Sequence, residues 1–143
     1  MLKVVLDANI FVSAVLKPHS DLAKIFELVR EDKIKLIFSE DILSEIRAAL
    51  LYPKIKKRHR RTQKGIDEFL NKASQASILA QGRIDIDEIR EDPGDNKYLT
   101  AALEAKTDFI VSGDHPLKDL KVFEGIRILD PSAFLVLLTK GAV

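Results

Sequence analysis

Two carboxylates of this sequence follow short apolar segments. The run Leu2–Leu6, interrupted only by a lysine, ends at Asp7, and the run Phe109–Val111 is followed within three residues by Asp114. Runs of this length and composition predict strands buried on both faces, as in the centre of a parallel sheet. Ligands in open α/β sheets bind beyond the carboxyl ends of the strands. We therefore expect Asp7 and Asp114 to lie together at the edge where such a sheet places its chemistry.

Two further acids lie in helices that are predicted to begin near that edge. Segment 40–51 has a helical spacing of apolar residues, and Glu45 falls along one edge of its buried stripe. Asp95 stands at the third position of another helix start, with Asp92 as the predicted N-cap and Pro93 as the first helical residue. A solvated helix carboxylate is the alternative interpretation of Glu45. Capping and the helix dipole are the alternative explanation of Asp95.

Four carboxylates that converge would repel one another and raise one another's pKa unless a cation neutralised them. The chain has no cysteine, which excludes thiolate nucleophiles, disulfides and zinc sites with cysteine ligands. With oxygen ligands, the fitting ion is Mg²⁺ or Mn²⁺. Such an ion activates water, orients a phosphodiester and stabilises its leaving oxygen. The acids therefore indicate metal-dependent hydrolysis as the chemistry of this edge.

Alternating strands and helices must position these acids. Apolar runs predict strands at 2–6, 34–38, 109–111 and 126–129, with a weaker candidate at 83–86. Segments of helical spacing alternate with them, including 21–31, for which Ser20 is the predicted N-cap. This order predicts an α/β fold, a three-layer α/β/α sandwich with a mainly parallel sheet of four to five strands. The length of 143 residues suits a single domain over residues 1–143.

The most basic stretch of the chain lies between residues 54 and 64. Its candidate RNA-binding residues are Lys56, Lys57, Arg58, Arg60 and Arg61. One interpretation is a surface that binds the phosphates of a nucleic acid, and the other is a solvated connector. The formal net charge of +1 favours neither interpretation, because a global charge can conceal local patches.

The sequence indicates a cytoplasmic protein. Its first residues lack the basic and apolar segments of a secretory signal. The apolar run 134–138 is far too short to cross a bilayer. We therefore expect no association with a membrane.

Taken in order, four parts of the chain resemble the motifs of the PIN domain, particularly of its prokaryotic toxin-like group related to the VapC ribonucleases. They are Val5–Asn9, the helix acid Glu45, Asp92–Asn96 with the helix after it, and Val111–Asp114. The resemblance covers nearly the whole chain. It implies a parallel α/β/α sandwich and an endoribonuclease that uses Mg²⁺ or Mn²⁺ to hydrolyse RNA phosphodiester bonds.

Carried over position by position, the resemblance implies roles for these acids and their neighbours. The catalytic and metal-binding acids would be Asp7, Glu45, Asp95 and Asp114. Asn9 and Ser112 would orient carboxylates or contact the substrate. Asp92 and Asn96 would shape the start of their helix.

One departure from the family pattern follows Asp114. Many relatives carry another acid two residues further on, where this chain has His115-Pro116. If that acid helps to hold a metal in the relatives, this protein is expected to bind its ion less tightly. Alternatively, His115 takes the place of the acid.

The resemblance also implies partners. A VapC-related protein would be the toxin component of a toxin–antitoxin pair, with RNA as its substrate, a small antitoxin protein as its inhibitor, and a homodimer or higher oligomer as its assembly. The alternative function is a catalytically weak PIN fold that binds RNA or protein.

Two other enzyme classes fit the sequence less well. A haloacid-dehalogenase-like phosphatase needs a second aspartate where this chain has Asn9, and a response-regulator receiver needs a phospho-accepting aspartate at a strand end occupied by Ser39.

Overall fold

The computed structural model describes residues 1–90 and 92–141, and these form six strands. The strands are β1 (Leu2–Leu6), β2 (Ile34–Phe38), β3 (Ile78–Leu79), β4 (Phe109–Val111), β5 (Val122–Phe123) and β6 (Ile126–Leu129). They make one sheet in the order β3-β2-β1-β4-β6-β5. Neighbouring strands run parallel, except that β5 pairs with β6 in the antiparallel direction.

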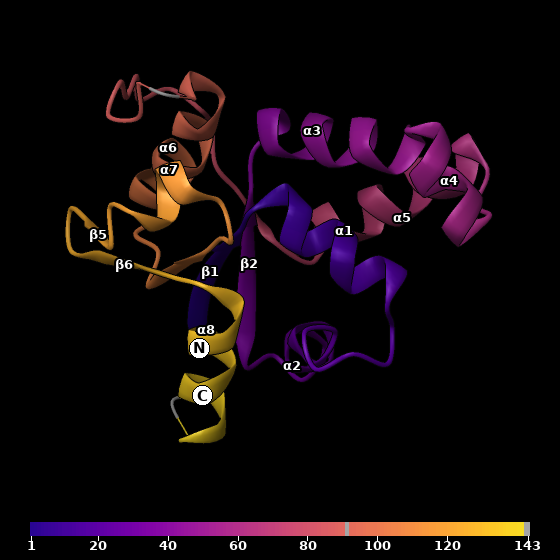
Figure 1. Cartoon of the computed structure of the whole chain (residues 1–143), viewed down its shortest axis with the longest axis horizontal. Coiled ribbons are helices and arrows are strands. Elements are labelled where there is room, and N and C mark those ends of the chain that lie inside the picture. Colours follow the sequence, from indigo (N-terminus) through magenta and orange to yellow (C-terminus); the bar gives the residue numbers. More distant parts are fainter. Residues whose placement is uncertain (91, 142–143) are drawn as a thin grey trace.

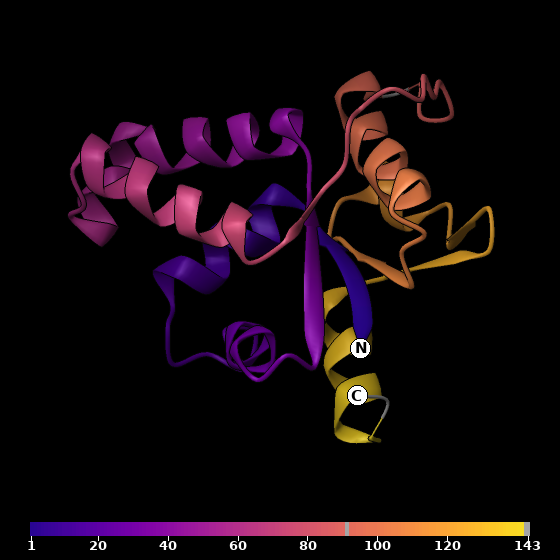
Figure 2. The same ribbon diagram turned by 180° about the vertical axis from the view of Figure 1, so that it is seen from behind.

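Helices cover both faces of this sheet. They are α1 (Ala8–Leu16), α2 (Lys24–Arg30), α3 (Glu40–Leu51), α4 (Pro53–His59), α5 (Gln63–Gln75), the 3-10 helix η1 (Pro93–Asp95), α6 (Asn96–Glu104), α7 (His115–Lys118) and α8 (Pro131–Thr139). Figures 1 and 2 show α1 to α5 on one side of strands β1 and β2, and α6 and α7 on the other. The predicted α/β/α sandwich with a mainly parallel sheet is confirmed. In the part of the chain that the structure describes, no helix has both the length and the apolar character needed to cross a membrane.

Strand β1 lies at the point where the order of the sheet reverses. It pairs with β2 on one side and with β4 on the other, so the connections leave it in opposite directions. Its residues Val4, Val5 and Leu6 are buried because helices cover both faces. A crevice for a ligand opens at such a switch point, beyond the carboxyl ends of the strands. Asp7 is the first residue beyond that end.

Phenylalanine rings fill the layer between the sheet and the first helices. Phe11 of α1 meets Phe26 of α2 and Phe38 of β2 edge-on, with ring centroids 5.3 and 5.7 Å apart. Phe69 of α5 lies 6.1 Å from the same ring. Edge-on aromatic pairs are favourable beyond the area that they bury. This cluster therefore fixes α1 against β2, and with it the end of β1 from which α1 begins.

The prediction of four to five strands is wrong, because the sheet has six. The two shortest strands, β3 and β5, have two residues each, which is too short to produce a recognisable alternation. Residues 83–86, predicted as a weak strand, lie in a loop. Strand β3 instead uses Ile78, whose place continues the helical spacing of the apolar residues in α5, so the sequence does not distinguish it from that helix.

Two helix starts also differ from the prediction. Helix α2 begins at Lys24, with Ala23 as its N-cap, because the Ser20 hydroxyl accepts the Ala23 backbone N–H at 3.3 Å and closes a separate turn before the helix. Helix α3 ends at Leu51, as the predicted segment 40–51 does, and Pro53 then opens α4 at the first position, where a missing N–H has no cost. The basic stretch is therefore partly helical.

Candidate active site

Three polar residues come together at the carboxyl ends of β1 and β4. Leu6 of β1 pairs with Val111 of β4, so the residues that follow these two lie side by side. The Ser112 hydroxyl donates to Oδ2 of Asp7 at 2.8 Å and accepts the backbone N–H of Asp114 at 3.0 Å. Ser112 is itself completely buried. It therefore fixes the positions of both strand-end acids.

Asp7 is a buried carboxyl group with only 1% of its surface exposed. Its Oδ1 accepts the backbone N–H of Asn9 at 2.9 Å, which makes Asp7 the N-cap of α1. Burial, and after it a hydrogen bond with the Asp114 carboxyl group, raises the pKa of Asp7 from 3.8 to about 7. The hydrogen bonds from Asn9 and Ser112 oppose this rise because they favour the charged form. With no cation bound, Asp7 therefore retains a proton up to near neutral pH.

Asp95 approaches the same edge from η1, the turn before α6. It is buried, and in the described residues its Oδ2 has no hydrogen-bond partner. Burial raises the pKa of Asp95 to about 6, helped by the negative charges of Asp92, Asp114 and Glu45 and opposed by Lys97. A buried carboxylate oxygen with no donor is costly, since it has lost its water and gained nothing in return. Asp95 is therefore a carboxylate that a cation would stabilise.

Glu45 completes the group from α3, where two residues of α6 hold it. The Tyr98 hydroxyl, which is buried, donates to Oε1 of Glu45 and accepts the backbone N–H of Ala8 at 3.1 Å. Burial and the hydrogen bond to Glu45 raise the pKa of Tyr98 well above its ordinary value, so the phenol remains a donor. The Lys97 ammonium forms an ion pair with Oε2 of Glu45. Both oxygens of Glu45 are thus engaged.

The donor set suits a hard divalent cation such as Mg²⁺ or Mn²⁺, which takes carboxylate oxygens as ligands. Oδ2 of Asp95 has no hydrogen-bond partner in the described residues, and burial, with the neighbouring acids, raises the pKa values of Asp7 and Asp95, so a cation bound among these carboxylates would stabilise their charged forms. Within residues 1–90 and 92–141, however, no three acidic or imidazole side chains are grouped as ligands of one ion. Glu45 is turned to Tyr98 and Lys97, so metal binding by all four acids requires these contacts to be exchanged.

The four residues predicted to support the acids have different roles. Ser112 holds Asp7 and Asp114 through its side chain, whereas Asn9 contributes its backbone N–H and exposes its side chain. The Asn96 side chain donates to the Ile89 carbonyl oxygen at 3.0 Å and accepts the Ile89 N–H at 2.8 Å. Asn96 therefore anchors the loop before η1.

Asp92 is the N-cap residue of η1, directly before Pro93 as predicted, but it does not cap the turn with its side chain. Its side chain accepts no capping hydrogen bond from the described residues, because Pro93–Asp95 form a 3-10 turn and α6 begins only at Asn96. Asp92 is exposed, and its charge contributes to the raised pKa of Asp95.

Lys97 and Tyr98 were missed by sequence reasoning. The only signal for Tyr98 is its place within the apolar face of α6, because a buried phenol needs a hydrogen-bond partner. Nothing in the sequence indicated a role for Lys97, since a lysine in the first turn of a helix is normally solvated.

His115 stands next to the position at which many relatives carry the missing acid. Its side chain faces Asp119 one turn further along the chain, with Nδ1 of His115 3.7 Å from Oδ1 of Asp119.

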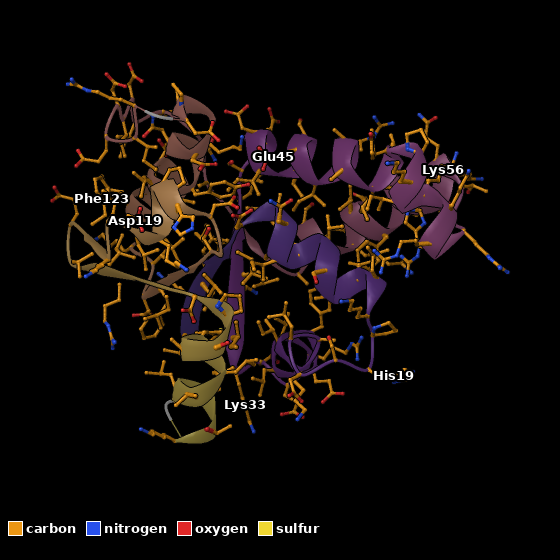
Figure 3. All side chains as sticks on the ribbon, in the orientation of Figure 1. His19, Lys33, Glu45, Lys56, Asp119 and Phe123 are labelled. Atoms are coloured by element: carbon orange, nitrogen blue, oxygen red, sulfur yellow. The ribbon has the colours of Figure 1, made fainter. Side chains whose placement is uncertain are left out.

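The five basic candidates lie away from the acids. Figure 3 places Lys56 at the outer end of the helical arm formed by α3, α4 and α5, and Glu45 in the half of α3 nearer the sheet. The rise along α3 alone separates the two regions by at least about 9 Å. All five side chains belong to exposed residues, and none pairs with an acid of the described residues. The Arg61 guanidinium also lies 4.7 Å above the Phe69 ring, so it has a packing role.

A groove of about 660 Å³ opens beside Glu45 and Lys97. The start of α3, the loop around Gly82 to Ile86 and the start of α6 line it, with Ser44 and Thr100 among its polar groups. Of the four predicted catalytic acids, Glu45 is the one that lines this groove. A substrate lying in the groove would therefore reach the site from the α3 and α6 side.

Replacing Asp95 with Asn should stabilise the metal-free protein at high pH. The pKa values of Asp7 and Asp95 are raised from 3.8 to about 7 and about 6. From pH 3.8 up to these raised values, the folded state therefore binds more protons than the unfolded chain. Their stabilising contribution is complete below pH 4 and is lost as the pH rises through 6 to 7. Asp95→Asn should therefore raise the free energy of unfolding at pH 8 by about 1–3 kcal/mol.

Urea unfolding in EDTA at pH 8 and pH 4.5 measures this difference. The gain should shrink toward zero at the lower pH, and the exposed control Asp87→Asn should show no comparable gain at either pH. An Asp95→Asn variant that is less stable than the wild type at pH 8 would mean that this carboxylate is not under electrostatic stress.

Comparison with known proteins agrees with the resemblance of the motifs. Residues 3–116 match the PIN domain family. An uncharacterized protein of Methanocaldococcus jannaschii, MJ1680, is 34% identical over 120 residues, which are 84% of this chain and 76% of that protein. The matched range includes all four acids of the site.

Proposed function

Because this chain belongs to the PIN domain family, whose members are generally nucleases, we propose that it is an endoribonuclease that depends on Mg²⁺ or Mn²⁺. The observation that carries the proposal is the group of acids at the switch point of the sheet. Asp7 and Asp95 are buried there with raised pKa values, and Oδ2 of Asp95 lacks a partner. Such an arrangement is unfavourable for folding alone and becomes favourable when a divalent cation is bound.

Asp7, Glu45, Asp95 and Asp114 are the residues that would hold the ion. When bound, a divalent ion supplies an activated water for attack on phosphorus and neutralises charge on the leaving oxygen. Ser112 keeps Asp7 in place through its hydroxyl, and Tyr98 does the same for Glu45. Because the pKa of Asp7 is raised to about 7, its proton must leave before this carboxyl group can act as a ligand.

In the part of the chain that the structure describes, the acidic site offers no thiol and no free hydroxyl as a covalent nucleophile. The chain has no cysteine, and the buried Ser112 hydroxyl is committed to Asp7 and to the Asp114 backbone. Direct hydrolysis by water therefore fits these residues better than a route through a covalent enzyme intermediate. The exposed basic residues of α4 would hold the RNA backbone during this reaction by contacting its phosphates.

We further propose that the protein is the toxin of a toxin–antitoxin pair. The support is the resemblance of its motifs to those of the VapC-related members of the family. A small antitoxin would then cover the acidic site, and the chain would self-associate. Co-expression with a protein encoded by an adjacent gene, followed by a cleavage assay of the purified complex, tests this part of the proposal.

A cleavage assay tests the nuclease activity. The protein is freed of metal with EDTA and then incubated with labelled single-stranded RNA, structured RNA or DNA of the same sequence, with Mg²⁺ or Mn²⁺ added back. We expect RNA to be cut only after the metal is restored, and DNA to be cut much less. A protein that cuts no substrate with either ion would contradict the proposal.

The engagement of Glu45 favours a second candidate function, an RNA- or protein-binding module with weak catalysis. Both oxygens of Glu45 are taken by Tyr98 and Lys97, so in this state Glu45 contributes no open ligand. Binding of RNA would then be equally strong with and without Mg²⁺. Measuring RNA affinity in EDTA and in Mg²⁺ beside the cleavage assay separates the two functions.

A further inference from the structure

Lys97 is the one basic side chain that pairs with an acid of the site in the described residues. Its ammonium contacts Oε2 of Glu45, and it also opposes the raised pKa of Asp95. Only 18% of the Lys97 side chain is exposed, compared with 65% for Lys24 in its pair with Asp21. The Lys97–Glu45 pair, with 39% of the Glu45 side chain exposed, is therefore better shielded from solvent than the Lys24–Asp21 pair, in which 79% of Asp21 is exposed.

The Lys97 ammonium contacts the Glu45 oxygen that would be available to a metal ion. Oε1 of Glu45 is taken by the buried Tyr98 hydroxyl, which leaves Oε2 as the oxygen open to exchange, and Lys97 occupies it. A divalent cation and an ammonium that contact the same carboxylate oxygen would repel each other, even with partial screening by solvent. Lys97 also lines the groove, so its flexible side chain has space into which it can withdraw.

We propose that Lys97 is a displaceable counter-ion of the acidic site, which competes with the divalent metal for Glu45. Without metal, its ammonium neutralises Glu45 and limits repulsion within the group. When metal binds, the ammonium leaves Oε2 of Glu45 and moves into the groove. This inference rests on the proposed function, since it concerns the same metal.

The direction of a change in metal affinity tests the proposal. Lys97→Met keeps the length of the side chain and removes the charge, so it should bind Mn²⁺ about tenfold more tightly than the wild type in isothermal titration calorimetry. Lys97→Arg keeps the charge and should bind Mn²⁺ no more tightly than the wild type. The matched control is Lys24→Met, which removes the same charge from the exposed pair with Asp21 and should leave Mn²⁺ affinity unchanged.

A second measurement tests the metal-free half of the proposal. In EDTA at pH 8 and low salt, Lys97→Met should lower the melting temperature by about 2–5 °C. The same substitution in a Glu45→Gln background should cause no further loss, because the charge that Lys97 neutralises is already absent. If Lys97→Met does not fold, Lys97→Gln serves the same comparison, since it also removes the charge.

Unchanged or weaker Mn²⁺ binding by the uncharged variants would overturn the proposal, because Lys97 would then support Glu45 as a ligand and would not compete for it. This outcome differs from failure of the proposed function, in which the wild type binds Mn²⁺ but cuts no RNA. If neither the wild type nor any Lys97 variant binds Mn²⁺, both proposals are wrong.

Discussion

Asp7→Asn is expected to lower the rate of RNA cleavage at saturating RNA by about 10³-fold or more, while RNA affinity stays within about threefold of the wild type. The asparagine Oδ1 can still accept the Asn9 N–H and cap α1, so the fold is preserved. The substitution removes the negative charge that a metal needs. Loss of that charge also reduces repulsion of RNA phosphates, so binding should not weaken.

Single-turnover cleavage and equilibrium binding of one labelled RNA measure both effects. The matched control is Asp108→Asn, because Asp108 precedes β4 at the opposite edge of the sheet, where its Oδ2 accepts the Lys3 N–H at 2.8 Å. This control should cut RNA at nearly the wild-type rate. Cleavage by Asp7→Asn at the wild-type rate would show that the acids do not perform the reaction.

Replacing basic residues at the end of α4 and directly after it should have the opposite effect. Changing Lys56, Lys57, Arg58 and Arg60 to Gln, with Arg61 retained because it packs on Phe69, should weaken RNA binding at least about tenfold at low salt. Each phosphate contact that is lost should reduce the slope of log affinity against log salt by about 0.7 for a single strand. Cleavage at saturating RNA should remain largely intact.

Filter binding at several salt concentrations tests the basic-residue prediction on RNAs of different sequence. The control is the double variant Lys24→Gln and Lys33→Gln, which removes exposed lysines elsewhere, and Figure 3 shows Lys33 well away from both Glu45 and Lys56. If the four-residue variant keeps the wild-type salt slope, the basic stretch is a solvated connector and RNA reaches the acids by another path.

The strand-end acids could be located from the sequence because strands obey a simple rule. A short apolar run predicts a buried strand, a parallel sheet aligns the carboxyl ends of its strands, and the next polar residue then lies at the ligand-binding edge. The pairing of Leu6 with Val111 places Asp7 and Ser112 side by side in agreement with this rule. Glu45 and Asp95 needed the additional order of the family motifs, because helix carboxylates are usually solvated.

The contacts made by helix side chains could not be located in this way. Whether Lys97 turns to solvent or to Glu45 depends on how closely α6 approaches α3, and the spacing of apolar residues does not determine this distance. Strands β3 and β5 also could not be predicted from the sequence. Each has only two residues, which form a strand because they pair with β2 and β6 and show no apolar pattern of their own. The 3-10 turn at Pro93–Asp95 is a similar case, because its sequence suits the start of an α-helix equally well.

The position of the site explains why these contacts matter for function. Asp7 and Asp114 follow strands β1 and β4, whereas Glu45 comes from α3 and Asp95 from η1, the turn before α6. A small change in the approach of α3 to α6 would therefore alter the metal site without disturbing the sheet. Lys97 and Tyr98 connect these two helices through Glu45, which makes them the residues that set this geometry.

The most direct test of the metal site is anomalous diffraction from crystals of the protein soaked in Mn²⁺. Data collected at the manganese edge locate the ion independently of any activity. We expect a peak bounded by the carboxyl groups of Asp7, Glu45, Asp95 and Asp114, with the Lys97 ammonium moved away from Oε2 of Glu45. A peak elsewhere, or none in crystals of protein that cuts RNA in the same Mn²⁺ solution, would contradict it.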